Sequence, residues 1–192
     1  MSEYIKIGLQ FCWLAVLTYW FVSGFSAKKA VYQEPLFKRV LLYWFPLVVA
    51  VLLLGPGEWF GHTLIRENFV PHTNFVGLIG LVFCVSGAVI ACWSRYTLGK
   101  NWSLSVQKKE NPELIENGLY KIVRHPIYSG LLLLFIGNAI IVGDYRGIIA
   151  VVIVFVSFWF KLKKEEKLLI EHFGFKYIDY RKRTKALVPF VV

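Results

Sequence analysis

The sequence predicts an all-α polytopic membrane protein with about five transmembrane helices and a helical hairpin in its C-terminal half. Of the 192 residues, 57% are hydrophobic and 18% are charged, whereas soluble domains contain about 45–50% apolar and about 25% charged residues. Five apolar segments are separated by polar loops, and Lys and Arg are concentrated in alternate loops. The seven tryptophans are typical of aromatic belts at membrane interfaces. Together these features favour lipid as the solvent.

The first three apolar segments lie at residues 4–25, 40–54 and 75–93. The first and third reach the ~20 residues that a helix needs to cross a bilayer. The second is shorter and stops at the helix-breaking sequence GPG. The first segment lacks the charged start and the small-residue cleavage site of a signal peptide, so we expect it to be a retained span.

The last two apolar segments, residues 127–142 and 147–160, are separated only by GDYRG. They are short for membrane spans, because a helix rises only about 1.5 Å per residue. Tyr128, Trp159 and Lys161 can extend them by lying at the interface or by snorkelling. The tight turn between them predicts an antiparallel helical hairpin.

The distribution of Lys and Arg predicts the orientation. The loops near residues 26–39 and 94–126 and the C-terminal tail are rich in Lys and Arg, whereas the other two loops contain only Arg66 and Arg146. The positive-inside rule then places the C-terminus in the cytoplasm and the N-terminus outside. The polar segments 95–125 and 161–192 share the cytoplasmic side and flank the hairpin. We therefore expect an N-terminal part, residues 1–94, with three spans, and a second part, residues 95–192, with the cytoplasmic loop, the hairpin and the basic tail, which would be the catalytic part if the protein is an enzyme.

The segment GLYKIVRHPIYSG, residues 118–130, gathers reactive side chains at the start of an apolar helix. Pro126 suits the first helical position, which places His125 near the N-cap and Tyr128 in the first turn. One interpretation is structural: Arg124 binds lipid phosphate, Tyr128 belongs to an aromatic belt and His125 caps the helix. The other is functional, because ionisable residues next to a membrane helix are candidates for a site.

The segment KLKKEEKLLIEHFG, residues 161–174, follows the hairpin. Lys161 and Glu165 are four residues apart and share a helix face. Glu165 and Glu166 form an acidic pair among basic neighbours, although an amphipathic helix with solvated charges is the alternative. Tyr177 and Tyr180 follow on adjacent turns, and by themselves they are expected on the membrane surface and not in a pocket.

Several function classes lack support. The sequence contains no GxGxxG, Walker or HExxH motif and no GxSxG elbow. Cys12, Cys84 and Cys92 lie inside apolar segments without metal-binding spacing, so we predict packing roles and no metal. The net charge of +10 is more typical of loops that face anionic lipid than of nucleic-acid binding.

Four pieces of the sequence together resemble the isoprenylcysteine carboxyl methyltransferase family, within the wider group that includes phospholipid N-methyltransferases. They are LGKNWS (98–103), ENGLYKIVRHPIYSG (116–130), EEKLLIEHFGFKYIDYRKRT (165–184) and LVP (187–189). The match covers roughly residues 95–192 in the family's order and spacing. The N-terminal half matches only as hydrophobic spans, and five spans in total resemble the small prokaryotic members.

The resemblance implies an S-adenosylmethionine site between the cytoplasmic loop and the segment after the hairpin. Aromatic faces favour a cationic sulfonium, a glutamate can bind ribose hydroxyls or an amino group, and methyl transfer by positioning demands no metal. Carried over by motif, the cofactor-binding residues are Gln107, Pro112, Glu113, Leu114, Ile115, Tyr120, His125, Pro126, Ile127, Tyr128 and Glu165.

The sequence departs from the family on the acceptor side. Carboxyl-methylating members usually carry an arginine four residues before the glutamate, and this chain has Lys161. Lysine cannot form arginine's bidentate fork to a carboxylate. We expect Lys161 to neutralise an anionic acceptor, or the acceptor to be something other than a prenylcysteine. Lys161 and Arg124 are the candidate catalytic residues.

The predicted function is S-adenosylmethionine-dependent methylation of a carboxylate or thiol on a small lipophilic acceptor, by an enzyme embedded in membrane lipid. One alternative is N-methylation of phosphatidylethanolamine-type lipids. A sterol-type membrane reductase would need NADPH, for which no 2′-phosphate pocket is evident. A transporter subunit or assembly factor is the non-enzymatic alternative. Transporters place polar residues at the bilayer midplane, where the hairpin offers only Asn138.

Overall fold

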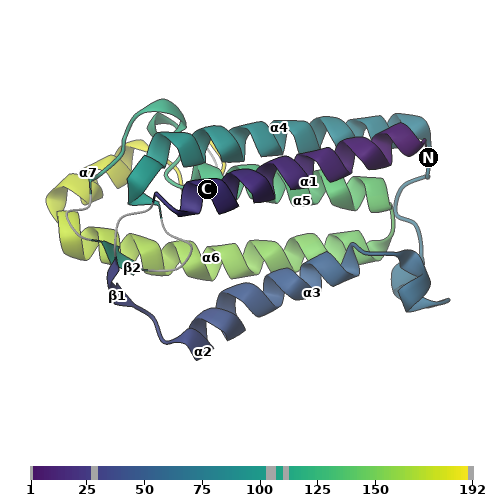
Figure 1. Cartoon of the computed structure of the whole chain (residues 1–192), viewed down its shortest axis with the longest axis horizontal. Helices are drawn as coiled ribbons and strands as arrows, with labels where there is room; N and C mark the ends of the chain where they lie inside the picture. Colours follow the sequence, from purple (N-terminus) through teal and green to yellow (C-terminus); the bar gives the residue numbers. More distant parts are fainter. Residues whose placement is uncertain (1, 27–29, 103–106, 110–112, 190–192) are drawn as a thin grey trace.

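The computed structural model describes residues 2–26, 30–102, 107–109 and 113–189, and it is dominated by long helices that run along one axis (Figure 1). The prediction of an all-α membrane fold is confirmed, with a two-stranded sheet of β1 (Ala30–Gln33) and β2 (Gln107–Lys109) as an unpredicted addition. The long helices are α1 (Glu3–Gly24), α3 (Phe45–Leu53), which continues α2 (Leu36–Arg39) and η1 (Val40–Trp44), α4 (Asn74–Leu98), α5 (Pro126–Val142) and α6 (Tyr145–Phe173).

Four helical segments are long and apolar enough to cross a membrane by length and composition, namely Glu3–Gly24, Leu36–Leu53, Asn74–Asn101 and Tyr145–Phe173, while α5 is a shorter apolar helix. These segments and α5 correspond to the five predicted apolar segments. The fifth is longer than the sequence suggested, because α6 continues to Phe173 and has 29 residues. At about 1.5 Å per residue, α6 exceeds the ~30 Å hydrocarbon core. Its last turns therefore carry Lys161, Glu165 and Glu166 to the polar end of the bundle.

Helices α4 and α5 form the closest helix pair, because glycines face each other at two levels. A Cβ on Gly87 would lie 2.5 Å from the Gly130 carbonyl oxygen, and a Cβ on Gly137 would lie 2.5 Å from that of Gly80. Backbone contact through small residues is a common way to associate helices in membranes. This contact fixes α5, which carries His125 at its N-cap.

A buried ionic cluster closes the hairpin end of the bundle. Gly143 ends α5 in the left-handed conformation, with φ of 76°. The Asp144 carboxylate then accepts hydrogen bonds from Arg146 at 2.7 Å and Arg66 at 3.4 Å, and Arg146 also donates to the carbonyl of Gly55 at 3.2 Å. The cluster ties the loop after α3 to the hairpin at the end far from α7 (Phe175–Arg183).

The remaining helices surround the α4–α5–α6 core. Helix α1 packs on α4, and α3 packs on α6, so these two helices occupy different sides of the bundle (Figure 1). Their outward faces carry exposed large hydrophobics such as Phe11, Phe21, Phe45 and Val48. Exposed apolar side chains on this scale suit a lipid environment. Short helices complete the chain: η2 (Gly57–Phe60), η3 (Leu64–Arg66), η4 (Gly99–Asn101) and η5 (Gly118–Lys121).

Candidate functional site

A cavity of about 540 Å³ lies inside the bundle. Residues of α1, η1, α3, α5, α6, α7 and the loop before α5 line it. Its polar end contains tyrosines, His125 and Glu165, and its apolar end contains aromatic and aliphatic residues of α1, η1 and α3. The volume falls within the ~300–1,000 Å³ range of ligand pockets.

The start of α5 is fixed by the C-terminal tail. The backbone N–H groups of Arg124 and His125 donate to the carbonyls of Lys185 (2.8 Å) and Ala186 (3.0 Å). Val123 and Lys185 form a parallel bridge, and the Ser129 hydroxyl donates to the Leu187 carbonyl. The N-cap position predicted for His125 is correct, but its side chain makes no capping hydrogen bond and lines the cavity.

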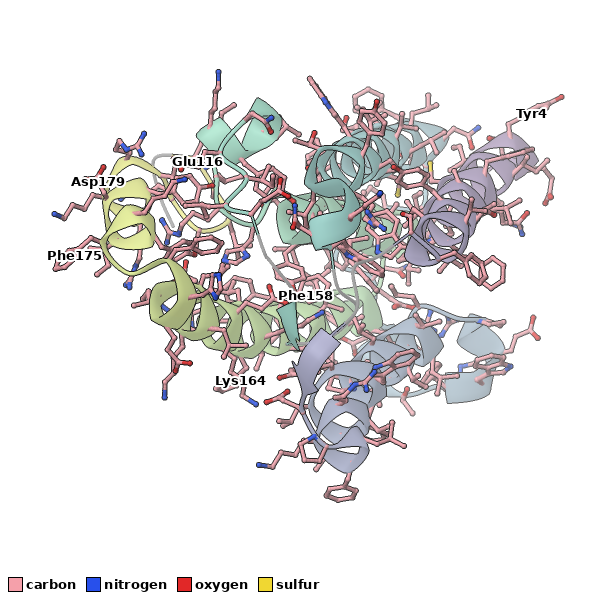
Figure 2. All side chains as sticks on the ribbon, turned by 60° about the vertical axis from the view of Figure 1, so that its left-hand side comes forward. Tyr4, Glu116, Phe158, Lys164, Phe175 and Asp179 are labelled. Carbon is pink, nitrogen blue, oxygen red and sulfur yellow. The ribbon has the colours of Figure 1, made fainter. Side chains whose placement is uncertain are left out.

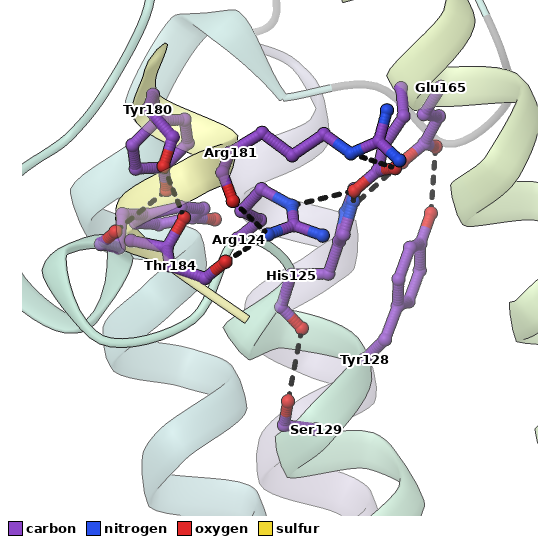
Figure 3. Close-up of polar contacts among 10 residues, drawn as sticks. Arg124, His125, Tyr128, Ser129, Glu165, Tyr180, Arg181 and Thr184 are labelled. Carbon is purple, nitrogen blue, oxygen red and sulfur yellow. Dashed lines mark hydrogen bonds and ion pairs between the residues drawn. The ribbon is translucent and has the colours of Figure 1, made fainter. Parts of the chain in front are cut away.

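Glu166 is the centre of a buried ionic cluster, and its partners Arg124, His125 and Arg181 are labelled in Figure 3. Its carboxylate lies 2.7 Å from Arg124 Nε, 3.5 Å from His125 Nε2 and 3.8 Å from Arg181 Nε. Arg124 also donates from Nη1 to the carbonyls of Arg181 and Thr184. A buried carboxylate is tolerated only when it is paired and hydrogen-bonded. Glu166 therefore joins the loop before α5, α6 and the tail, and it is not the solvated charge of the alternative interpretation.

Glu165, the neighbour of Glu166, faces the cavity. Its Oε1 accepts a hydrogen bond of 2.7 Å from the Tyr128 hydroxyl, and its Oε2 lies 3.8 Å from His125 Nδ1. The Tyr128 ring is stacked between His125 (5.7 Å between ring centroids) and Phe158 (4.9 Å). The cavity thus has an acidic group beside two stacked rings, and Figure 3 shows the Glu165 carboxylate bonded to the Tyr128 hydroxyl. Tyr128 is held by these contacts, which the aromatic-belt interpretation did not predict.

The expectation that Tyr177 and Tyr180 lie on the membrane surface is wrong. They are 1% and 3% exposed, and both line the cavity. The reason is the turn at Gly174, whose φ of 54° starts α7 in a new direction, so that α7 packs back toward the loop. The Tyr180 hydroxyl donates to the Tyr120 carbonyl at 2.7 Å.

Burial also sets the protonation of these phenols. It raises the pKa of Tyr120, Tyr177 and Tyr180 above the usual tyrosine range. All three are therefore protonated at neutral pH and can act as hydrogen-bond donors. The Tyr120 hydroxyl uses its proton on the Ser94 carbonyl at 3.4 Å.

Two buried polar atoms beside the cavity lack a hydrogen-bond partner within the part of the chain that the structure describes. They are the Tyr177 hydroxyl and Nε2 of His125, of which Nε2 still lies 3.5 Å from the Glu166 carboxylate. Buried polar atoms in native proteins nearly always have a partner, so an exception calls for a ligand or another explanation. The Tyr177 hydroxyl, the Glu165 carboxylate and the aromatic faces are therefore groups that could hold a polar, cationic ligand.

The other predicted cofactor residues fall into three groups. Glu113, Leu114, Ile115 and Ile127 line the cavity with Tyr120. Pro126 is fully buried at the start of α5 and is not among the lining residues. The backbone of Gln107 pairs with Gln33 in the small sheet, its side chain lies outside the described part, and Pro112 lies outside the described residues.

Lys161 lies between the polar and apolar ends of the cavity. Its Nζ is 5.3 Å from the centre of the Tyr128 ring and 5.7 Å from that of Tyr43. Sequence analysis did not single out Tyr43, which stands in an apolar segment without any motif. The apolar end, lined by Trp13, Trp20 and residues of α3, was also missed, because the N-terminal half matched the family only as hydrophobic spans.

Comparison with known proteins agrees with this geometry. A family model described as phospholipid methyltransferase matches residues 75–176, from α4 to the start of α7. The chain belongs to the phospholipid methyltransferase family. The matched residues include the loop before α5 and the glutamate pair, and therefore most of the polar end of the cavity, while Tyr177 and Tyr180 lie just beyond them.

The chain is also similar to isoprenylcysteine methyltransferases. It is 29% identical over 120 residues to protein-S-isoprenylcysteine O-methyltransferase B of Arabidopsis thaliana, covering 61% of each chain. The enzyme of Schizosaccharomyces pombe is 24% identical over 202 residues, covering 97% of this chain and 84% of that one. The mouse enzyme is 31% identical over 141 residues, covering 70% and 49%. The chain spans about three fifths of the length of the plant relatives.

A solved structure gives the same result. The chain matches the eukaryotic intramembrane Ras methyltransferase ICMT with a TM-score of 0.58 and 27% identity, over 77% of this chain and 52% of the other. The resemblance inferred from the sequence motifs is therefore confirmed.

Proposed function

We propose that this protein is an S-adenosylmethionine-dependent membrane methyltransferase that methylates a carboxylate, or a thiol, on a small lipophilic acceptor. One observation carries the proposal: a single cavity joins a polar, acidic and aromatic end to an apolar end. A water-borne donor and a lipid-borne acceptor could meet in such a space. The relatives named protein-S-isoprenylcysteine O-methyltransferase support the same reaction class.

The polar end is the proposed donor site. S-adenosylmethionine, when bound, supplies an electrophilic methyl group on a cationic sulfonium. The stacked rings of His125 and Tyr128 would favour that positive charge. The Glu165 carboxylate would accept hydrogen bonds from donor hydroxyl or amino groups. Tyr120 and residues Leu114 and Ile115 would complete the walls, as the resemblance implies.

The apolar end is the proposed acceptor site. Trp13, Trp20 and Trp44 offer an apolar surface to a lipophilic body, and Lys161 offers a positive charge where that surface meets the donor site. A carboxylate acceptor is already negatively charged, so it needs no general base. The protein then has to position two reactants and exclude water, which by itself can lower a barrier by about 7–11 kcal/mol.

Arg124 was predicted to be catalytic, and its contacts favour a positioning role. Its guanidinium is bound to Glu166 and to the carbonyls of Arg181 and Thr184. We propose that it orients His125 through this cluster. We further propose that this end of the bundle faces the cytoplasm and that the N-terminus lies outside, as the loop charges predict.

Lipid N-methylation is the second candidate, because the matching family model is described as phospholipid methyltransferase. The charge of Lys161 argues against it, since an ammonium headgroup would meet a like charge in the cavity. The two products differ chemically. A methyl ester releases methanol in base, whereas an N-methyl group stays on the lipid.

The test is calorimetric titration of the detergent-purified protein with S-adenosylmethionine. We expect saturable binding by the wild type, binding at least ten times weaker for Glu165→Gln and His125→Ala, and unchanged binding for Glu58→Gln. Glu58 is an exposed glutamate in η2 that does not line the cavity. A folded wild type without binding would overturn the proposal and leave the polar cluster to a non-enzymatic role.

A further inference from the structure

The second membrane segment is interrupted by a π-turn at η1. The Phe45 N–H bonds to the carbonyl of Val40, five residues earlier. Short π-turns inside helices occur frequently at functional sites. Tyr43 is the buried residue of this turn, at 4% exposure, whereas Val40 and Trp44 are exposed. The π-turn therefore accompanies one polar side chain that faces inward from an otherwise apolar helix, and that side chain lines the cavity.

The Tyr43 hydroxyl is anchored outside the cavity. It donates to Glu34 Oε2 at 2.6 Å, and Glu34 Oε1 accepts from Lys164 Nζ at 3.1 Å. Burial alone would raise the pKa of Glu34, but the hydrogen bonds from Tyr43 and Lys164 hold that pKa below its usual value. Glu34 is thus a carboxylate at neutral pH, and it links the segment before α2 to α6. Figure 2 shows Lys164 on α6 close to this segment.

The Tyr43 ring lies near two lysines, Lys161 and Lys164, and Lys164 Nζ is 5.5 Å from the ring centre. The Lys161 ammonium lies 5.7 Å from the Tyr43 ring centre and 5.3 Å from that of Tyr128. Each ring is anchored by its hydroxyl on a different glutamate, Tyr43 on Glu34 and Tyr128 on Glu165. A cation between two aromatic faces is attracted to both. The pair of rings therefore restricts a side chain that otherwise has large rotational freedom.

We propose that Tyr43 is a positioning residue for the acceptor: with Tyr128 it holds the Lys161 ammonium in the cavity, so that this ammonium binds the anionic group of a lipophilic acceptor. The inference rests on the proposed function for its acceptor class. The two anchored rings restrict the position of the Lys161 ammonium, which a flexible lysine side chain would not hold by itself.

The test measures acceptor binding without donor, so it does not depend on methyl transfer. The probes are an N-acetyl-S-prenylcysteine and its neutral methyl ester, titrated into the detergent-purified protein. We expect the wild type to bind the carboxylate more tightly than the ester. Tyr43→Leu should reduce that preference about tenfold, the order expected when one cation–π contact is lost in a desolvated site. Tyr43→Phe, which keeps the ring, should retain more of the preference for the carboxylate than Tyr43→Leu does.

Two further variants separate positioning from general damage. Lys161→Arg in the Tyr43→Leu background should restore part of the preference, because a guanidinium can bind a carboxylate through two parallel hydrogen bonds without help from the ring. Trp159→Leu is the matched control, because it removes a ring whose centre lies 4.5 Å from Lys163 Nζ. Neither Trp159 nor Lys163 lines the cavity, so the preference for the carboxylate should be unchanged.

Equal binding of both probes by the wild type, an unchanged preference in Tyr43→Leu, or failure of the arginine rescue in a folded double variant would overturn the proposal. Donor titration of the same samples distinguishes this failure from failure of the proposed function. If the protein binds S-adenosylmethionine but does not prefer the carboxylate, the proposed donor site stands and the proposed role of Tyr43 is wrong.

Discussion

Glu165 and Glu166 are neighbours in the sequence, but the same substitution should affect stability at one position and donor affinity at the other. The Glu166 side chain is 5% exposed and lies within 4 Å of Arg124, His125 and Arg181. The Glu165 side chain is 22% exposed, lines the cavity and accepts one hydrogen bond, from Tyr128. We expect Glu166→Gln to lower stability and Glu165→Gln to lower donor affinity.

The magnitude for Glu166→Gln follows from its contacts. Removing one partner of a buried ion pair costs about 3–5 kcal/mol. The lower end applies, because Arg124 keeps the carbonyls of Arg181 and Thr184 and glutamine retains an acceptor oxygen. For a chain of this size, about 3 kcal/mol corresponds to a fall in Tm of about 6–12 °C. The contact of Glu166 with Arg181 adds little to this loss of stability, since the Arg181 side chain is 48% exposed and solvent screens such a contact.

The assay is thermal unfolding in detergent, followed by tryptophan fluorescence, together with donor titration well below the Tm of each variant. Glu166→Gln should melt early, and Glu165→Gln should melt within about 2 °C of the wild type but bind donor at least ten times more weakly. The reasoning is refuted if Glu166→Gln melts with the wild type, or if Glu165→Gln unfolds early while its donor affinity is unchanged.

Three other substitutions test separate parts of the structure. Gly87→Leu should prevent the close contact of α4 and α5, since even a Cβ would lie 2.5 Å from a backbone atom. The variant should fail to give a monodisperse peak in size-exclusion chromatography, and an intact peak would contradict this helix packing. Tyr177→Phe removes a buried hydroxyl without a partner in the described residues, so the Tm should stay the same or rise slightly. Donor affinity should fall several-fold, and unchanged donor affinity would show that the hydroxyl does not bind the donor. Asp144→Asn should lower the Tm by several degrees, because Arg146 and Arg66 lose their carboxylate. Donor affinity in the same samples should be unaffected, and its loss in the folded variant would contradict the separation of the hairpin end of the bundle from the cavity's polar end.

Local patterns were sufficient to predict the helices and part of the site. Hydropathy placed all five apolar segments, and GDYRG predicted the hairpin between α5 and α6. The RHPIY motif placed His125 and Tyr128 at the start of a helix, and the spacing of Lys161 and Glu165 placed them on one face. All four residues line the cavity, so the motif and the helical spacing were enough to predict that they lie in the site.

Long-range packing decided what the sequence did not reveal. Successive residues on a helix differ in direction by about 100°, and only the position of the C-terminal tail determines that Glu166 meets Arg124 while Glu165 faces the cavity. Tyr177 and Tyr180 are buried because α7 turns at Gly174, which the amphipathic pattern does not predict. Tyr43 faces inward at a π-turn, and its apolar neighbours gave no signal for one.

The most direct test of the account is methyl transfer by the purified protein in lipid vesicles. The protein would be incubated with S-adenosylmethionine labelled in its methyl group and an N-acetyl-S-prenylcysteine, and the lipophilic product would then be treated with base. We predict that the label enters the acceptor and is released as methanol, and that Glu165→Gln abolishes both signals. Label that stays on phosphatidylethanolamine after base, or no incorporation by a folded protein, would contradict the account.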